Sequence, residues 1–552
     1  MDSNRYEITA NVVDVVGRKI VPATLSVDNG IISSLKESAN PGTNYLLPGF
    51  IDAHVHIESS MLLPREFARA AVVHGTVAAV SDPHEIANVL GSEGVRFMLD
   101  AAEGVPFKFC FGAPSCVPAT RFETSGAQLD ADDVCRLLDD PRIGYLSEMM
   151  DYPGVLSGDP QVRAKIDGAL AGSKPVDGHA PGLRGDEARH YLAAGITTDH
   201  ECFTRDEALD KLAAGAKILI REGSAARNFD ALCSLLDEFP DDCMLCSDDK
   251  HPDDLMVGHI NQLVQRAIAA GNDPMNALRA ACVNPVQHYG LDVGLLRVGD
   301  DADFIEVDNL SELRVLRTFV RGRQVAQRGS SRIGRAALRK SPPHRMDAAA
   351  VPASSFVIPS PQRAAKANVI VAVDGQLITH RVVQTAAIVD GQAVADPERD
   401  ILKIAVVTRY LAEKKEPSVA FVKGFGMQRG AIASSVAHDS HNVIAVGRSD
   451  DDLSAAVNLV IDAGGGLAVS DGQTRQLLPL PVAGLMSLQS CDEVAEAYGE
   501  LDRLTKRLGC TLRSPFMTLS FMVLLVIPEL KLSDQGLFDV GKFAFQPLFE
   551  DH

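Results

Sequence analysis

Residues 48–60, PGFIDAHVHIESS, decide the fold of this chain. They form an apolar run in which His54 and His56 stand two positions apart. Side chains at i and i+2 of a strand project to the same side, so two imidazoles placed in this way can bind one metal ion. A lone His-x-His pair is weak evidence, because two polar residues also occur incidentally at strand ends. Its weight depends on whether this run belongs to a barrel, since barrel enzymes hold their chemistry at the C-terminal ends of the strands.

The sequence that follows has the pattern of a parallel barrel wrapped by helices. Apolar strand-like runs alternate with amphipathic helix-like runs about eight times. The predicted strands are residues 50–58, 76–81, 107–112, 144–150, 175–179, 197–202, 217–221 and 244–249. The CxxC pair Cys243 and Cys246 falls in the last of these runs. Without a second pair it favours a buried strand over a zinc site.

Weaker β-strand patterns lie on both sides of the barrel segment. Asp28, Asn29 and Gly30 predict a hairpin turn between two alternating segments, and similar segments return after the barrel. Beyond them the chain turns basic and rich in Ala, Ser and Pro before a second α/β pattern begins. The predicted fold is therefore α/β, with a small β-sandwich domain (1–48 and 298–327), a (β/α)8 TIM-type barrel (49–297), a linker (328–354) and a C-terminal α/β domain (355–552).

The composition limits the classes of partner. With 73 acidic against 53 basic residues and no Trp, the chain repels phosphate backbones and lacks the aromatic platforms that stack on bases. We therefore expect a small-molecule substrate and no nucleic acid. We also expect no membrane partner, because the most apolar stretch, residues 521–527, is too short to span a bilayer. The N-terminus lacks a signal-peptide pattern and the 10 cysteines are scattered, so we expect a cytoplasmic protein with reduced thiols. The acidic surface and the extra domain leave room for a homodimer.

Further candidate metal ligands fall at the ends of later predicted strands. A His or Glu at a barrel rim is most often a hydrogen-bonding surface group, but joint recurrence on several strands favours a metal centre. Four imidazoles and two carboxylates suit zinc, manganese or iron. They exceed one tetrahedral site, and a carboxylate that bridges two ions about 3.5 to 4 Å apart uses them all. We therefore predict a binuclear centre with Glu148 as the bridge, and a metal-activated hydroxide as the nucleophile. The six candidate ligands are His54, His56, Glu148, His179, His200 and Asp248.

This pattern resembles the amidohydrolase superfamily, with His-x-His on strand one, a bridging acid on strand four, His on strands five and six, and Asp on strand eight. The flanking segments are similar to the adenine-deaminating members of that superfamily along essentially the whole chain. These segments are SDPHEIANVLG (81–91), EMMDYPGV (148–155), DGHAPGL (177–183), LIREGSAARN (219–228), AHDSHN (437–442) and PLPVAGLMS (479–487).

The resemblance implies hydrolytic deamination of adenine to hypoxanthine and ammonia. It also implies two divalent ions per chain, manganese first, with iron and zinc as alternatives. In that scheme the hydroxide attacks C6 of the purine, while Asp248 takes its proton and relays it to the ring or the leaving amine. Proton transfer by a positioned group of this kind typically contributes ~10² to 10⁴ in rate.

Two polar loops are candidates for substrate binding, because a purine edge needs both donors and acceptors. Asp82 and Glu85 are predicted to bind substrate and His84 to relay protons, or else Asp82 caps the next helix. The loop after strand seven offers further candidates, of which the arginine could instead pair with a rim carboxylate. These candidates are Arg221, Glu222 and Ser224.

Three further groups of residues are assigned supporting roles. Glu58 and Glu201 adjoin ligand positions and could orient the imidazoles. The segment from His438 to Asn442 contains two histidines and an aspartate, but no partner cluster at metal-ligand spacing is evident. We interpret it as a polar loop that packs over the barrel mouth, with the further hypothesis that it closes the site against water.

Two other functions remain open at this stage. An amidohydrolase acting on another aminopurine or on a cyclic amide would use the same hydroxide, although a carboxylated Lys often bridges the metals in the cyclic-amide branch and Glu148 stands here. A non-catalytic scaffold that inherited the barrel should have lost a ligand, and all six candidates are present.

Overall fold

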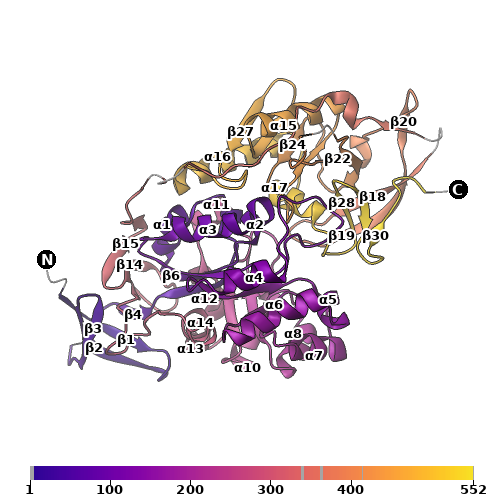
Figure 1. Cartoon of the computed structure of the whole chain (residues 1–552). Helices are drawn as coiled ribbons and strands as arrows, with labels where there is room; N and C mark the ends of the chain where they lie inside the picture. The colour runs from indigo at the N-terminus through magenta and orange to yellow at the C-terminus, as the bar shows by residue number, and fades with distance from the viewer. Residues whose placement is uncertain are drawn as a thin grey trace.

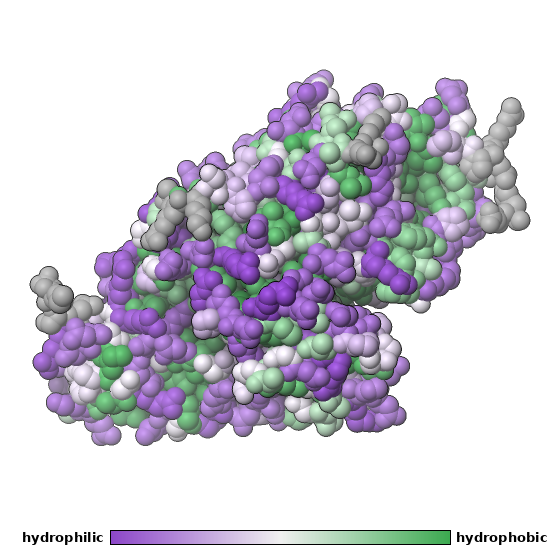
Figure 2. All heavy atoms as spheres, in the orientation of Figure 1, coloured by the Kyte–Doolittle hydropathy of each residue, from purple (hydrophilic) through white to green (hydrophobic). Residues whose placement is uncertain are grey.

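A computed structural model describes residues 5–40, 42–336, 338, 341–360, 365–412 and 415–550. The barrel lies between a β-sheet near the N-terminus and a C-terminal domain that packs across the barrel's opposite side (Figure 1). On the face seen in Figure 2, polar side chains cover much of both domains and are interrupted by smaller apolar areas. No helix in the described ranges is both long and apolar enough to cross a membrane.

The two ends of the barrel segment join in one eight-stranded sheet. Asn29 and Gly30 have positive φ values of 49° and 86°, which confirms the predicted hairpin turn between the second and third strands. The last strand extends the sheet to Ser331, into the segment expected to be a linker. In sheet order the strands are β16 (Ser330–Ser331), β15 (Arg323–Gln327), β14 (Val315–Val320), β13 (Phe304–Val307), β4 (Tyr45–Pro48), β1 (Tyr6–Asp14), β2 (Lys19–Asp28) and β3 (Ile31–Glu37).

Eight parallel strands form the barrel at the eight places where strands were predicted. Their sequences are apolar and their residues are almost entirely buried, as expected for strands covered on both faces. They are β5 (Phe50–Val55), β6 (Thr76–Ser81), β7 (Lys108–Ala113), β8 (Ile143–Met149), β9 (Val176–Gly178), β10 (Thr198–Asp199), β11 (Lys217–Arg221) and β12 (Cys243–Cys246). Cys243 and Cys246 therefore lie in a buried strand, and all 10 cysteines are free thiols.

The barrel closes between its first and last strands. The backbone N–H of Asp248 donates to the carbonyl of His54 at 2.9 Å, and the N–H of His56 donates to the carbonyl of Asp248 at 3.3 Å. Closure thus brings the His-x-His pair beside the end of the eighth strand. The surrounding helices are α1 (Pro64–Ala71), α2 (His84–Leu90), α3 (Ser92–Ala102), α4 (Ala131–Leu138), α5 (Tyr152–Ser157), α6 (Pro160–Ala171), α7 (Gly185–Ala193), α8 (Arg205–Ala213), α9 (Phe229–Leu232), α10 (Leu235–Glu238), α11 (Pro252–Val257), α12 (Ile260–Ala269), α13 (Pro274–Leu278) and α14 (Asn284–Tyr289).

The C-terminal domain is built on a second eight-stranded sheet with helices packed against it. In sheet order its strands are β19 (Thr379–Thr385), β18 (Lys366–Ala372), β23 (Ser418–Lys423), β22 (Ile401–Val407), β25 (Val443–Gly447), β24 (Ala431–Ser434), β26 (Gly466–Ser470) and β27 (Arg475–Pro479). Its helices are α15 (Asp450–Asp462), α16 (Cys491–Arg507) and α17 (Pro515–Ser520). Two small three-stranded sheets complete it: β17 (Ile358–Pro359), β21 (Gln392–Val394) and β20 (Ala387–Val389), and β28 (Leu530–Ser533), β29 (Gly536–Asp539) and β30 (Ala544–Phe545).

The barrel and the C-terminal domain share one buried apolar core. Polar contacts also join the two domains. Tyr498 and His251 share a 2.7 Å hydrogen bond, and the side-chain amide of Asn442 donates to the carbonyl of Thr124 at 2.8 Å. The second contact holds the segment 437–442 against the barrel mouth. The prediction that this loop packs over the mouth is confirmed.

Candidate metal centre and active site

The six predicted metal ligands meet at the C-terminal ends of the barrel strands, and all six are buried. Glu148 lies at their centre. Its Oε1 is 3.3 Å from Nε2 of His56 and 3.9 Å from Nε2 of His54. Its Oε2 is 3.2 Å from Nε2 of His200 and 2.5 Å from Nδ1 of His179. The two carboxylate oxygens therefore face two different histidine pairs, which is the arrangement that a bridging carboxylate needs.

Asp248 lies on the side of the His-x-His pair. Its Oδ1 is 3.1 Å from Nε2 of His56 and 3.6 Å from Nε2 of His54. Its Oδ2 accepts a 2.5 Å hydrogen bond from Arg221, whose guanidinium also binds both oxygens of Glu201. Oδ2 of Asp248 is thus bound by Arg221, and Oδ1 faces His54 and His56.

The hydrogen-bond pattern shows that these residues fit a metal ion. Nδ1 of His56 lies 3.1 Å from the backbone carbonyl of Asp82, which can only accept, so in the neutral ring that binds a metal Nδ1 carries the hydrogen and Nε2 has a lone pair. That lone pair faces Nε2 of His54 at 3.2 Å and the oxygens of Glu148 and Asp248. Several electron-pair donors converge here, and a divalent cation satisfies them together.

Both carboxylates of the cluster are held in the ionised form that metal ligation requires. Burial alone would raise the pKa of Glu148, but His179 and His200 hold it well below its usual range. Burial likewise opposes ionisation of Asp248, yet the Arg221 guanidinium keeps its pKa well below the usual range. The hydrogen bonds and charges around the two acids outweigh the cost of burial.

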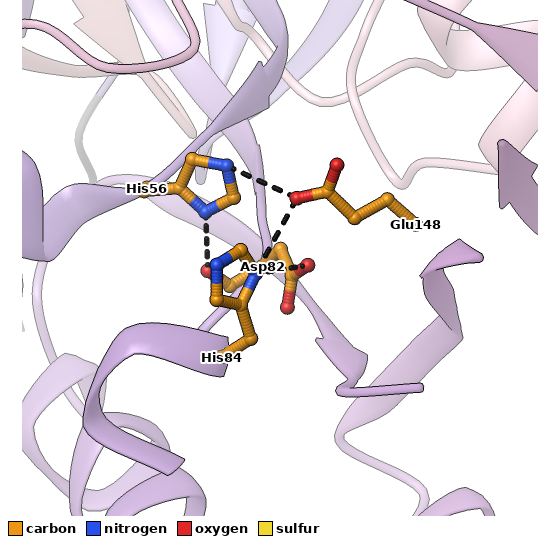
Figure 3. Close-up of side chains that lie close together, drawn as sticks. All are labelled: His56, Asp82, His84 and Glu148. Atoms are coloured by element: carbon orange, nitrogen blue, oxygen red, sulfur yellow. Dashed lines mark hydrogen bonds and ion pairs between the residues drawn. The ribbon is translucent and has the colours of Figure 1, made fainter. Parts of the chain in front are cut away.

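The loop after β6 places a histidine beside the candidate metal ligands (Figure 3). Nδ1 of His84 lies 2.9 Å from Oδ2 of Asp82 and 3.3 Å from Oε1 of Glu148. Asp82 makes no capping bond to α2, since its carboxylate contacts His84 and the N-cap position is Pro83. The alternative in which Asp82 caps the helix is therefore wrong.

A second cluster joins the barrel to the C-terminal domain. Oε1 of Glu85 receives a 2.5 Å hydrogen bond from Nδ1 of His438, and Oε2 receives one from Nε2 of His441. All three side chains are buried. Glu85 is thus the partner of the His438–Asn442 segment that the sequence did not reveal, because the two stretches are more than 350 positions apart.

The cavity at the barrel mouth has walls from both domains. The barrel contributes His56, His84, Glu85, Glu148, His179, His200, Asp248 and Asp249 among its lining residues. The C-terminal domain contributes Leu377, His438, Asp439, Phe521 and Leu524. Its volume is about 20 Å³, room for about one water molecule. The apolar wall residues carried no sequence signal, because leucine and phenylalanine are ordinary core residues.

The residues predicted from the loop after β11 do not line this cavity. Arg221 lies behind Asp248 and pairs with it and with Glu201, which is the alternative left open for it. Glu222 pairs with Arg266 at 2.7 Å and lines a separate cavity. Ser224 donates to Asp254 at 2.6 Å and accepts the backbone N–H of His251. Glu222 and Ser224 therefore lie outside the lining of the cavity, and their predicted substrate contacts stay predictions.

The expectation that Glu58 and Glu201 orient imidazoles is met unequally. Glu201 lies 3.5 to 3.6 Å from ring nitrogens of His179 and His200, on the outer side of the metal cluster. Glu58 instead accepts the backbone N–H of Ile86 at 3.3 Å, and burial raises its pKa to about 7. Glu58 therefore supports the start of α2 rather than an imidazole.

Comparison with known proteins places the chain among amidohydrolases. Residues 45–325 match the amidohydrolase family, and residues 376–544 match the adenine deaminase C-terminal domain. The chain is 57% identical over 547 residues to adenine deaminase from Salinibacter ruber (strain DSM 13855 / M31), with 99% of each chain covered. It is 53% identical to adenine deaminase from Sulfurovum sp. (strain NBC37-1) and 50% identical to that from Methanosarcina mazei, each over 98% of this chain and 99% of the relative. The similarity therefore extends over both domains.

Proposed function

Because this chain belongs to the adenine deaminase family of amidohydrolases, we propose that it hydrolyses adenine to hypoxanthine and ammonia in the cavity at the barrel mouth. The observation that carries the proposal is the position of Glu148, whose two oxygens each face a different pair of histidines. This geometry supports a binuclear hydrolytic centre, and no ligand of such a centre is replaced in this chain.

The six buried side chains divide into two sets of ligands. His54, His56 and Asp248 with Oε1 of Glu148 would hold one divalent ion. His179 and His200 with Oε2 of Glu148 would hold the other. The nitrogen and oxygen donors suit Mn²⁺, which we propose as the native ion, and also accept Fe²⁺ or Zn²⁺. Bound divalent cations supply an ionised water as the nucleophile at neutral pH.

Asp248 is the proposed acceptor of the nucleophile's proton. Arg221 occupies Oδ2, so the proton would go to Oδ1, which has one lone pair for the ion and a second lone pair for the proton. His84 is the proposed relay to the substrate, because Asp82 holds its Nδ1 and its Nε2 is directed toward Glu85 and Asp439. Positioned proton transfers of this kind contribute ~10² to 10⁴ in rate.

The near-complete burial of the site strengthens these effects. The walls from both domains exclude bulk water, so the charges around Glu148 and Asp248 act in a medium of low polarity. Asp82 and Glu85 remain proposed substrate-side residues, Asp82 acting through His84. Arg221 is proposed to act through Asp248 and Glu201 and not on the substrate directly.

The composition supports two further proposals about the protein in the cell. The 10 cysteines, all of them free thiols, favour a reducing compartment and hence a cytoplasmic location. The acidic surface leaves room for a homodimer, which sedimentation of the purified protein would detect.

Metal analysis combined with product analysis tests the proposed function. Purified enzyme should contain about two divalent ions per chain, and adenine should yield equal amounts of ammonia and hypoxanthine. Other 6-aminopurines and a cyclic amide form the comparison panel, because a higher kcat/KM on one of them would favour the alternative substrate class. Protein that stays inert toward the whole panel after reconstitution with manganese, iron and zinc would instead be a scaffold.

A further inference from the structure

The cluster of Glu85, His438 and His441 has a different hydrogen-bond pattern from the metal cluster. The backbone N–H of Ala437 donates to Nδ1 of His441 at 3.1 Å, so this nitrogen carries no hydrogen. Burial lowers the pKa of His441, and the neutral ring therefore bears its hydrogen on Nε2. That N–H donates to Glu85. His441 is thus a fixed donor that holds a carboxylate, and its Nε2 has no lone pair for a metal.

His438 is held from one side and free on the other. Its Nδ1 donates to Glu85 at 2.5 Å, and its ring stacks on Phe521 with centroids 4.4 Å apart and an interplanar angle of 14°. Nε2 of the same ring is buried without a hydrogen bond among the described residues, 4.0 Å from Oδ1 of Asp249. Buried polar atoms normally have partners, so this nitrogen is available to a polar atom of a ligand in the cavity.

The apolar wall beside His438 suits the face of a planar base. Phe521, Leu524 and Leu377 line the cavity from the C-terminal domain. The buried Nζ of Lys531 donates to the carbonyls of Leu377 at 2.7 Å and Phe521 at 2.9 Å, which ties the two segments of the wall together. In Figure 1 the helix α17, directly before Phe521, lies between the barrel helices and the C-terminal sheet. The wall is thus a connected part of the C-terminal domain that faces the metal ligands.

We propose that the C-terminal domain supplies the base-binding half of the active site. Nε2 of His438 hydrogen-bonds a ring nitrogen of the 6-aminopurine, whose face packs against Phe521 and Leu524. Glu85 and His441 are positioning residues that fix the ring of His438. This inference rests on the proposed function for the identity of the base. Because small-molecule pockets are typically ~300 to 1,000 Å³ and this cavity is about 20 Å³, the wall moves outward when the base enters.

Two substitutions of His438 separate its two nitrogens. In His438→Asn the amide nitrogen takes the place of Nδ1 and can still donate to Glu85, but nothing replaces Nε2. In His438→Gln the amide reaches the place of Nε2 and the bond to Glu85 is lost. We expect His438→Asn to raise KM for adenine about 10-fold or more with a smaller change in kcat, and His438→Gln to recover part of that loss. His380→Asn, on the exposed surface of the same domain, is the matched control and should leave both constants unchanged.

Deaza analogues of adenine identify the contact on the ligand. Affinities of 1-deaza-, 3-deaza- and 7-deazaadenine are measured for the wild type and for His438→Asn. One analogue should bind the wild type more weakly by the factor that the substitution costs for adenine, and should lose nothing further in the variant. If every analogue loses the same factor in both proteins, Nε2 contacts no ring nitrogen and the proposal is overturned.

Two controls keep the result interpretable. Metal content and thermal unfolding are measured for each variant. If His438→Asn does not fold, Phe521→Leu takes its place as the test, because it keeps an apolar side chain and loses only the aromatic face. It should raise KM a few fold. If the wild type binds adenine without releasing ammonia, the proposed function fails while the binding series still tests the wall. If the wild type deaminates adenine and all variants match it in KM, the wall proposal alone fails.

Discussion

Two carboxylate–histidine clusters lie at the same barrel mouth. They differ in the backbone group that hydrogen-bonds the ring nitrogen facing away from the carboxylate. In the Glu148 cluster, a carbonyl accepts from Nδ1 of His56, which leaves a lone pair on the nitrogen that faces the carboxylate. In the Glu85 cluster, a backbone N–H donates to Nδ1 of His441, which puts a hydrogen on the nitrogen that faces the carboxylate. The same residue types are therefore arranged as candidate metal ligands in one cluster and as hydrogen-bonding partners in the other. For His56 and His441, the partner of the outer ring nitrogen decides between the two roles.

The comparison is tested most strongly by removing one charge from each cluster. Glu148→Gln should lower kcat/KM by at least ~10³ and reduce the bound metal, because the group between the two histidine pairs loses its charge. Glu85→Gln is the matched variant. It should weaken adenine binding and leave about two metal ions per chain. Metal analysis and kinetics on both proteins check this, and a loss of metal from Glu85→Gln would show that the second cluster also binds an ion.

The next largest effect concerns Arg221, the buried guanidinium that pairs with Glu201 and Asp248. Arg221 is buried and pairs with Glu201 and Asp248, so Arg221→Met leaves two buried carboxylates without their partner. We expect unfolding free energy to fall by about 3 to 5 kcal/mol in denaturant titrations. In Arg221→Lys, which keeps the charge but not the bidentate contact, the unfolding free energy should fall by less. Equal stability of all three proteins would mean that Arg221 does not neutralise this side of the cluster.

The Glu85 cluster should respond to pH in a defined direction. Although burial opposes protonation of His438, Glu85 and Asp249 raise its pKa from 6.5 to about 9, with Asp439 adding to the effect and the neighbouring His441 neutral. A raised folded pKa gives stability that is complete below the unfolded pKa and is lost as pH rises through the folded pKa. Between pH 6.5 and pH 9 the wild type should therefore lose about 2 to 3 kcal/mol more than His438→Asn.

Denaturant unfolding at several pH values measures this difference. Groups elsewhere titrate in both proteins and cancel in the comparison, provided that His438→Asn keeps its bond to Glu85. Parallel pH profiles for the two proteins would show that His438 is neutral in the folded state, and its free nitrogen would then act as an acceptor toward the base.

The first cluster could be predicted from sequence because barrel topology brings strand ends together. His54, Glu148 and Asp248 each lie at or just beyond the C-terminal end of an apolar strand, and the strands were placed correctly within a few residues. Once the strands close into a barrel, their C-terminal ends meet whatever the loops do. No contact between distant loops had to be guessed.

The second cluster could not be predicted because it depends on how two domains pack. His438 and His441 come from a loop of the C-terminal sheet, and nothing near them in the sequence indicates that Glu85 is their partner. The positions of the residues after β11 could not be predicted for a related reason. Glu222 forms an antiparallel bridge with Arg227, and this tight turn carries Ser224 toward α11 and away from the cavity. Nearness to a strand end was a good guide on the strand itself and a poor one beyond it.

The smallest expected effect tests that distinction directly. Ser224 follows a barrel strand and was predicted to bind substrate, yet its hydroxyl donates to Asp254 and accepts the N–H of His251. Ser224→Ala should lower the unfolding free energy by about 1 kcal/mol through the lost hydrogen bonds. Its kcat and KM for adenine should match those of the wild type, because the hydroxyl does not line the cavity. A KM that rises as far as in His438→Asn would mean that the loop after β11 swings in to contact the base. The barrel would then bind the base, and the proposal that the C-terminal domain supplies the base-binding half of the site would be wrong.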